Sequence, residues 1–327
     1  MRQTPEPEAA ETAPSGRQFA IGDGDAEAIV TEVGASLRAF TVGSEAIVWG
    51  YGVAAMSSGG RGQILAPWPN RLEDGTYEFA GVTAHAALDE PERNNAIHGL
   101  VRWLRWDTRE HSAQRVVLSC ELAPQPAYPW RLALEMSYEV TAGELVVGAR
   151  AENRSATPAP FGMGAHPYLD AGAFGADGCT LSLPADRRLL LDERGLPRGS
   201  SPVEGSGYDF RSGRPLAGVR LDDCFTELQS TRDGQVPEDS AWHAMLTRED
   251  GRRSVLWADS AWPYVMCYTG DTLPGEDRRR GVAVEPMTCP PNALRSGQSV
   301  VTLAPGRRWS GRFGIRSADG EHGRGLA

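Results

Sequence analysis

Two features of the sequence predict an all-β fold built from antiparallel hairpins. Several segments alternate apolar and polar residues with a period of two, which is typical of strands that bury one face. No stretch of ten or more residues has apolar positions at helical spacing, and 38 glycines with 23 prolines interrupt the chain too often for long helices. Short strands joined by long loops are therefore expected.

Three segments in the first half of the chain carry this alternation most clearly. Apolar residues occupy every second position in residues 116–122, 131–140 and 145–151. The connection Thr141-Ala142-Gly143-Glu144 is short and contains glycine, so the second and third segments are expected to pair as a hairpin.

A second hairpin is predicted near the C-terminal end. Residues 242–248 and 253–258 both have strand character, and Asp250-Gly251 lies between them. Asp-Gly readily adopts the positive φ angles of a type I′ turn, which is a strong local signal for a hairpin.

We predict one β domain over residues 17–316, because no Pro/Ser/Gly-rich linker divides the chain and no repeat recurs at a fixed period. Residues 1–16 are rich in Glu, Pro and Ala and lack the apolar segment of a signal peptide, so a disordered tail is predicted there. Residues 317–327 are polar and Gly-rich, which predicts a mobile tail.

Composition and charge exclude several classes of partner. The formal net charge is -10 and no Lys/Arg block is interleaved with aromatic residues, so nucleic acid is not an expected partner. No run approaches the roughly 18 apolar residues of a membrane helix, so no membrane association is expected. The five cysteines are widely spaced without C-x-x-C pairing, which predicts reduced thiols, no structural zinc and a cytoplasmic location.

Separate loop segments combine ionisable side chains with Gly, Pro and aromatic residues, as expected around a polar pocket. They contribute Asn70, Arg71, His98, His166 and Glu285, and an acidic pair adds Asp222. Imidazole exchanges a proton near pH 7, and glutamate is seldom buried unless it is paired or functional. Each residue also has an ordinary structural explanation: an arginine in a surface turn, a packed histidine, or a salt bridge at a strand end.

The same segments carry short motifs whose order and spacing resemble those of the aldose 1-epimerases of the galactose mutarotase type. The motifs are Pro-x-x-Asn-Arg at Pro67, Gly-x-Tyr-x-Phe at Gly75, His-Gly at His98, His-Pro-Tyr at His166, Asp-x-x-Phe at Asp222, Tyr-Thr-Gly at Tyr268 and Glu-Pro at Glu285. The resemblance covers nearly the whole chain. It implies a large antiparallel β-supersandwich, a sugar as substrate and no cofactor, and it leaves the preferred sugar open.

The resemblance also implies roles for individual residues. It makes His166 the general acid and Glu285 the general base, with hydroxyl-binding roles for Asn70, Arg71, His98 and Asp222. In this reaction a base removes the proton of the anomeric hydroxyl while an acid protonates the ring oxygen, and the opened sugar recloses on its other face. The imidazole and the carboxylate are expected to face each other across a cleft wide enough for a pyranose.

Two alternatives keep the fold and change the function. A hexose 6-phosphate substrate requires a cationic cluster beside the pocket, which Arg71 with Arg93 or Arg102 could supply. A non-catalytic sugar-binding protein needs no proton-transfer groups, so the presence of both His166 and Glu285 speaks against it.

A third alternative assigns a metal ion to the four residues His98, His166, Asp222 and Glu285. Imidazole and carboxylate are suitable ligands, but no close His-x-His spacing is present, and no metal is predicted. An apolar platform for a sugar face is available among Trp68, Trp103 and Tyr168, although tryptophans in β proteins are more often core residues. The sequence does not decide the oligomeric state.

Overall fold

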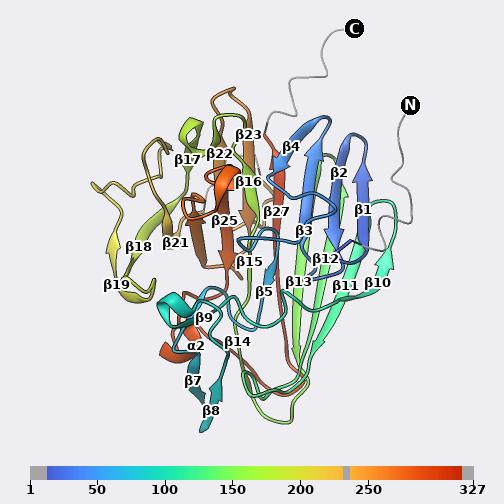
Figure 1. The fold of residues 1–327 in the computed structure, drawn as a ribbon, viewed down its shortest axis with the longest axis vertical. Coiled ribbons are helices and arrows are strands. Elements are labelled where there is room, and N and C mark those ends of the chain that lie inside the picture. Colours follow the sequence, from blue (N-terminus) through green and yellow to red (C-terminus); the bar gives the residue numbers. More distant parts are fainter. Residues whose placement is uncertain (1–12, 231–235, 319–327) are drawn as a thin grey trace.

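Two large antiparallel sheets packed face to face form the body of the protein (Figure 1). The structure is a computed structural model that describes residues 13–230 and 236–318. In the first sheet ten strands follow the order β1-β2-β3-β4-β16-β25-β24-β21-β18-β19, and β15 pairs with both β25 and β5. Its strands are β1 (Gln18–Asp23), β2 (Ala26–Thr31), β3 (Leu37–Val42), β4 (Glu45–Val48), β5 (Ile64–Leu65), β15 (Gly164–Ala165), β16 (Tyr168–Asp170), β18 (Ala185–Leu191), β19 (Pro197–Pro202), β21 (Asp222–Leu228), β24 (Tyr264–Tyr268) and β25 (Gly281–Met287).

The second sheet has the strand order β10-β11-β12-β13-β27-β23-β22-β17-β20. Its strands are β10 (Asp107–His111), β11 (Arg115–Leu122), β12 (Leu132–Thr141), β13 (Glu144–Asn153), β17 (Thr180–Ser182), β20 (Arg214–Pro215), β22 (Trp242–Thr247), β23 (Arg253–Ala258) and β27 (Arg308–Ser317). Apolar side chains from both sheets form one continuous core, and β1 and β2 lie against β12.

Small elements complete the described part of the chain. They are the paired strands β6 (Arg71–Glu73) with β9 (Asn95–Ile97), β7 (Thr76–Phe79) with β8 (Val82–His85) and β14 (Ala159–Phe161) with β26 (Val301–Leu303), and the short helices η1 (Pro91–Arg93), η2 (Gly175–Gly178), η3 (Gly275–Asp277) and α2 (Ala293–Ser296). Strands β6 and β7 contact α2, and β7, β8, β9 and α2 lie together at one end of the molecule (Figure 1, lower left). The prediction of an all-β fold is confirmed.

The first predicted hairpin is confirmed. Strands β12 and β13 pair from Leu132 opposite Asn153 to Thr141 opposite Glu144, across the turn at Ala142-Gly143. Burial alternates along β12 in the predicted phase. The upstream segment also forms a strand, since β11 pairs with β12 along its whole length.

The second predicted hairpin is confirmed, but its turn type differs from the prediction. Strands β22 and β23 pair, and the Arg248 N–H donates to the Arg252 carbonyl at 2.8 Å, which leaves a loop of three residues, 249–251. Only Gly251 in this loop has a positive φ, 84°. A three-residue loop needs one left-handed residue, whereas a type I′ turn needs two.

The ordered chain extends beyond both predicted domain boundaries. Ser15 is buried, and its carbonyl accepts the N–H of Val33 at 3.0 Å. The Ala318 N–H donates to the Arg253 carbonyl at 2.9 Å. The predicted tails within residues 1–12 and 319–327 lie outside the described residues.

All five cysteines are free and buried. Within the described ranges, no helix has the length and apolar character needed to span a bilayer.

Candidate active site

Glu285 lies in β25, a strand inside the first sheet whose seven residues are all buried. Alternate side chains of a strand point to opposite faces. Val282 and Val284 join the core between the two sheets, whereas Ala283 and Met287 belong to two small separate clusters. Glu285 shares the phase of the latter two, so its carboxyl group lies on the face of the first sheet that is turned away from the main core.

His166 occupies the connection between β15 and β16, where both backbone and packing fix its ring. Its N–H donates to the Gln63 carbonyl at 3.1 Å, and its carbonyl accepts the Gly62 N–H at 2.9 Å. The imidazole stacks on the ring of Tyr168, with 5.0 Å between centroids and 15° between planes. Gly60 also lies against the ring, because a Cβ added there would be 2.5 Å from Cδ2 of His166.

The His166 imidazole and the Glu285 carboxylate are in direct contact. Nε2 of His166 lies 3.3 Å from Oε1 of Glu285, and the two residues are only 4% and 2% exposed. The expected pyranose-wide gap between them is therefore wrong. Strand β15, which leads into His166, pairs with β25 through Gly164 opposite Met287, and this pairing brings the two side chains together.

Asn70 and His98 are held next to each other by the pairing of β6 with β9. The His98 N–H donates to the Asn70 carbonyl at 2.9 Å, and the Asn70 N–H donates to Nδ1 of His98 at 3.3 Å. A nitrogen that accepts a hydrogen bond carries no proton, so the neutral ring has its hydrogen on Nε2. Burial holds the pKa of His98 well below its usual value, and His166, Arg102 and Arg71 add to this effect. His98 can therefore act as a neutral donor through Nε2.

Arg71 is anchored by two carboxylates. Its Nε donates to both oxygens of Glu90, at 3.1 and 3.0 Å, and its Nη2 donates to Oδ2 of Asp222 at 3.1 Å. Asp222 begins β21 and lies opposite Tyr268 of β24. These contacts fix a planar donor and an acceptor side by side.

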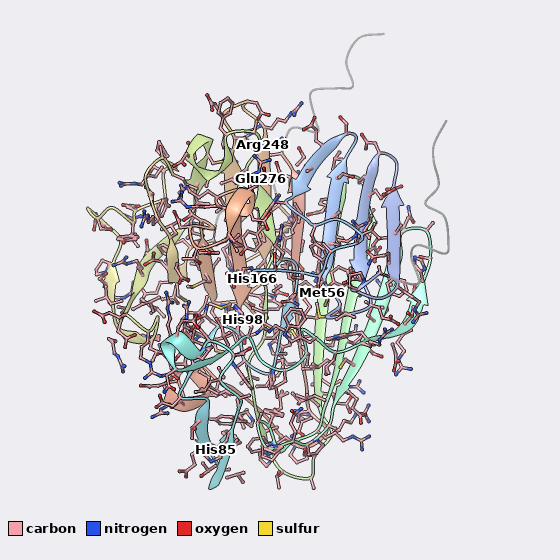
Figure 2. All side chains as sticks on the ribbon, viewed as in Figure 1. Met56, His85, His98, His166, Arg248 and Glu276 are labelled. Atoms are coloured by element: carbon pink, nitrogen blue, oxygen red, sulfur yellow. The ribbon has the colours of Figure 1, made fainter. Side chains whose placement is uncertain are left out.

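One cavity of about 380 Å³ brings the predicted residues together. Its lining includes all six of them: Asn70, Arg71, His98, His166, Asp222 and Glu285. His98 and His166 lie close together near the middle of the molecule, and their ring centroids are 5.4 Å apart (Figure 2). Nδ1 of His166 and Oε2 of Glu285 are buried without a hydrogen-bond partner among the described residues.

The sequence did not identify every lining residue. The additional ones are Gly59, Gly60, Glu90, Glu92, Ile97, Tyr268, Thr272 and Leu273, and the lining also contains Arg93 and Arg102. Tyr268 had a signal in its Tyr-Thr-Gly motif. Glu90 had none, because only the folded chain places it beside Arg71.

Burial determines the protonation of the contacting pair. It lowers the pKa of His166 to about 3. It raises the pKa of Glu285 well above its usual value, with Asp222 adding to the rise and Arg71 opposing it. Both pKa shifts arise because surroundings of low dielectric constant disfavour the charged form of each group. The pair therefore holds one proton and no net charge around neutral pH.

The aromatic residues considered as sugar platforms lie outside the lining. Trp68 and Tyr168 are buried, and Trp103 is half-exposed with the Arg102 guanidinium 5.1 Å from its ring centroid. Tyr268 contributes a phenol ring to the described cavity lining. In the described part of the chain, no three or more His, Cys, Asp or Glu side chains are grouped so that they could hold a metal ion.

Fold and sequence comparisons agree on the class of protein. Residues 17–316 match the sequence model described as aldose 1-epimerase. The chain belongs to the aldose 1-epimerase family, and its two antiparallel sheets form the galactose mutarotase fold.

Individual relatives differ in how much is known of them. The chain is 31% identical to the uncharacterized protein YihR of Escherichia coli K12 over 295 residues, which cover 90% of this chain and 91% of that one. It is 26% identical to human galactose mutarotase over 234 residues, which cover 69% of this chain and 66% of the human one.

Solved structures show the same fold at low sequence identity. The GalM/aldose epimerase homologue from C. elegans superposes with a TM-score of 0.79 at 17% identity, over 92% of this chain and 98% of that one. Galactose 1-epimerase from Lactobacillus acidophilus NCFM gives a TM-score of 0.74 at 22% identity, over 90% and 92% of the two chains.

Proposed function

We propose that this protein is an aldose 1-epimerase (mutarotase) that interconverts the α and β anomers of a free aldohexose without a cofactor. The observation that carries the proposal is the contact of 3.3 Å between His166 and Glu285 in the lining of one cavity. The anomeric hydroxyl oxygen and the ring oxygen of a cyclic aldose are bonded to the same carbon. Two groups that exchange protons with these oxygens must lie close together, as these two do.

The other lining residues supply donors and acceptors for hydroxyl groups. His98 donates through Nε2, Arg71 presents a fixed planar guanidinium, and the Asp222 carboxylate accepts. Oδ1 of Asn70 accepts the backbone N–H of Arg71 at 2.9 Å, which fixes the position of the Asn70 side chain. Polar groups fixed in this way orient the sugar without reorganisation on binding.

In the proposed reaction Glu285 takes the proton of the anomeric hydroxyl while His166 gives its proton to the ring oxygen. The bond between the anomeric carbon and the ring oxygen breaks, and a carbonyl group forms. The carbonyl turns, the freed hydroxyl attacks its other face, and both protons return along the same paths. The pair starts and ends with one proton, so no external acid or base is consumed.

The shared proton must lie on His166 when the ring opens. In the free enzyme the proton lies on the Glu285 carboxyl group, because burial disfavours both the imidazolium and the carboxylate. Transfer across the contact of 3.3 Å produces the reactive form.

Polarimetry tests the proposal directly. Catalytic amounts of the protein are expected to accelerate the optical rotation change of freshly dissolved α-glucose or α-galactose towards the same equilibrium value. A sugar-binding protein without catalysis would leave the rate at the level of the buffer. Unchanged rates with every free aldohexose in a panel would refute the proposed function.

The charges of the lining favour a free sugar over a hexose 6-phosphate. Each guanidinium there already has a carboxylate partner: Arg71 and Arg93 with Glu90 and Asp222, and Arg102 with Asp89. A phosphate would compete with these carboxylates and meet their repulsion. We expect kcat/KM for glucose 6-phosphate to be at least about tenfold below that for glucose, a difference of about 1.4 kcal/mol. The reverse preference would favour the phosphorylated substrate.

The protonation of the pair predicts the pH profile of kcat/KM. The free enzyme is active while the pair holds one proton. A second proton binds only as the pH falls through the lowered pKa of His166, about 3, so activity is expected to persist well below pH 6.5, the ordinary pKa of histidine. The alkaline limb is expected where Glu285 loses its proton, above the usual pKa of a glutamate.

This profile is measured after subtraction of the uncatalysed rate, at pH values where the near-ultraviolet circular dichroism is native. An acid limb centred near 6.5 would show that His166 titrates as an exposed imidazole, against the prediction.

A further inference from the structure

The loop that joins β18 to β19, residues 192–196, packs against Arg71 of the candidate site. It contributes no residue to the described cavity lining. Its shape is fixed by Asp192, whose Oδ1 accepts the N–H groups of Arg194 and Leu196 at 2.9 and 3.0 Å. The Gly195 N–H donates to the Asp192 carbonyl at 2.9 Å. The loop is therefore a preformed turn.

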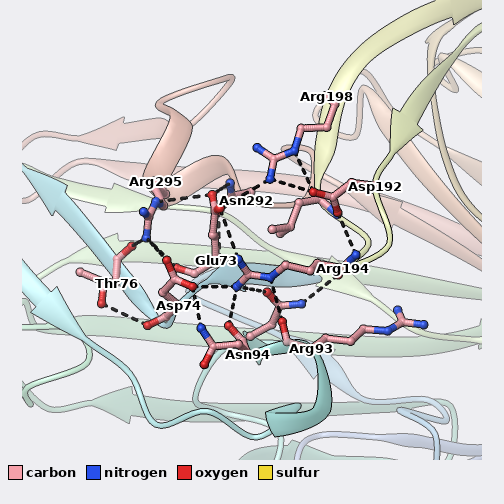
Figure 3. Close-up of polar contacts among 12 residues, drawn as sticks. Glu73, Asp74, Thr76, Arg93, Asn94, Asp192, Arg194, Arg198, Asn292 and Arg295 are labelled. Carbon is pink, nitrogen blue, oxygen red and sulfur yellow. Dashed lines mark hydrogen bonds and ion pairs between the residues drawn. The ribbon is translucent and has the colours of Figure 1, made fainter.

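The guanidinium of Arg194 binds the C-terminal end of the η1 turn (Figure 3). Glu92 and Arg93 of this turn line the cavity. Its Nε donates to the Arg93 carbonyl at 2.9 Å, and its Nη2 donates to the Asn94 carbonyl at 2.7 Å. Nη2 also contacts Oδ1 of Asp74 at 2.8 Å. One planar group thus holds the carbonyl oxygens of Arg93, the last residue of η1, and of Asn94, the residue that caps it.

A chain of hydrogen bonds continues from Arg194 to Arg71. The fully buried Asn95 donates from Nδ2 to the Arg194 carbonyl and to Oε2 of Glu90, both at 2.9 Å. Glu90 in turn accepts Nε of Arg71 with both oxygens. The position of the Arg71 guanidinium therefore depends on where the loop places Asn95 and Glu90.

Gly195 touches Arg71 directly. It has a φ of 74°, and a Cβ added to it would lie 2.5 Å from Nη1 and 2.8 Å from Cζ of Arg71. The backbone of the loop thus packs against the guanidinium. A side chain at this position would displace Arg71, whose flexible end can move.

We infer that the loop 192–196, through Arg194 and Gly195, is a positioning element that fixes Arg71 and thereby sets the affinity of the cavity for its sugar. The inference rests on the proposed function for its link to the sugar. A guanidinium held before binding loses less conformational freedom on binding, so displacement of Arg71 weakens binding of the sugar. The proton-transfer pair does not contact the loop, so the rate of the bound sugar depends on it less.

Gly195→Ala tests this, with Gly205→Ala as a matched control. Both glycines have a left-handed φ, 74° and 69°, but nothing lies within 4 Å of a Cβ at Gly205. We expect Gly195→Ala to raise KM for the active aldose about tenfold while kcat changes less than about twofold. Gly205→Ala shares the backbone strain, and KM is expected to stay at the wild-type value.

A second pair of variants covers the case in which Gly195→Ala does not fold. Arg194→Met is expected to raise KM, and Arg194→Lys to raise it less, because lysine keeps the charge and loses the planar fork. Arg187→Met is the control. Its side chain is 31% exposed against 30% for Arg194, and its contacts are to Ser200 and Glu227, away from η1. Equal KM values for the folded Arg194 and Arg187 variants would overturn the inference.

A crystal structure of Gly195→Ala separates this inference from the proposed function. If the loop positions Arg71, the guanidinium is expected to move in this variant and to lose its contact with Glu90 or with Asp222. Native contacts in that structure would overturn the inference even if the wild-type protein is an active mutarotase. An inactive wild type with a displaced Arg71 would overturn the proposed function and leave the positioning of Arg71 supported.

Discussion

Glu285→Gln is expected to lower kcat for anomerisation by about 10²- to 10⁴-fold, the usual contribution of one positioned proton-transfer group. This factor corresponds to about 3 to 5 kcal/mol of activation free energy. Glutamine has the shape of a protonated glutamate, but its amide cannot take up the proton of the anomeric hydroxyl. Polarimetry with freshly dissolved α-aldose measures the change, after subtraction of the buffer rate.

The fold of this variant is expected to remain intact. Burial already disfavours charge on Glu285, and an amide can still donate to Nε2 of His166 across the native contact. Glu78→Gln, an exposed position on β7, serves as the control and is expected to keep wild-type kcat. A Glu285→Gln protein that retains more than about a tenth of the wild-type kcat would exclude Glu285 as the base.

His166→Gln is expected to have a comparable effect on kcat, again about 10²- to 10⁴-fold. The glutamine amide cannot deliver a proton to the ring oxygen. The other residues proposed to bind the sugar are unchanged. KM is therefore expected to change much less than kcat. The same polarimetric assay, over a range of aldose concentrations, separates the two constants.

A double variant shows whether the two groups act as one unit. If Glu285 and His166 share one proton, Glu285→Gln with His166→Gln is expected to be about as slow as either single variant, because the second change removes nothing further. His85→Gln is the control, since this exposed histidine on β8 lies far from the candidate site (Figure 2). Multiplicative losses in the double variant would contradict a single proton-transfer unit.

Local patterns predicted strands β12 and β13, in which buried and less buried positions alternate. The alternation in β12 and β13 identified both strands, their pairing and their turn. Strand β25 shows no such alternation, because all its residues are buried on both faces. Its position inside the first sheet follows from pairing with β16 and β24. Strand β16 is distant in sequence, and β24 also lacks alternation because almost all its residues are buried.

The candidate site was predictable in composition and not in arrangement. Its six predicted residues come from separate segments between Asn70 and Glu285, and all of them line one cavity. The contact between His166 and Glu285 could not be predicted, because it depends on the register of β15 against β25. The loop at Arg194 and Gly195 carried no sequence signal, since a charged residue beside glycine is ordinary in a turn.

The sequence by itself determined the all-β class, the main hairpins and the family, because these depend on short-range periodicity and on motifs in fixed order. The tertiary structure alone decided which polar groups meet, how far apart they lie and which of them lose contact with water. The physical reason is that charge and proton affinity at a site depend on burial and on neighbours a few ångströms away. In this chain those neighbours are distant in sequence, as Arg71 and Asp222 are, and only the packing of strands brings them together.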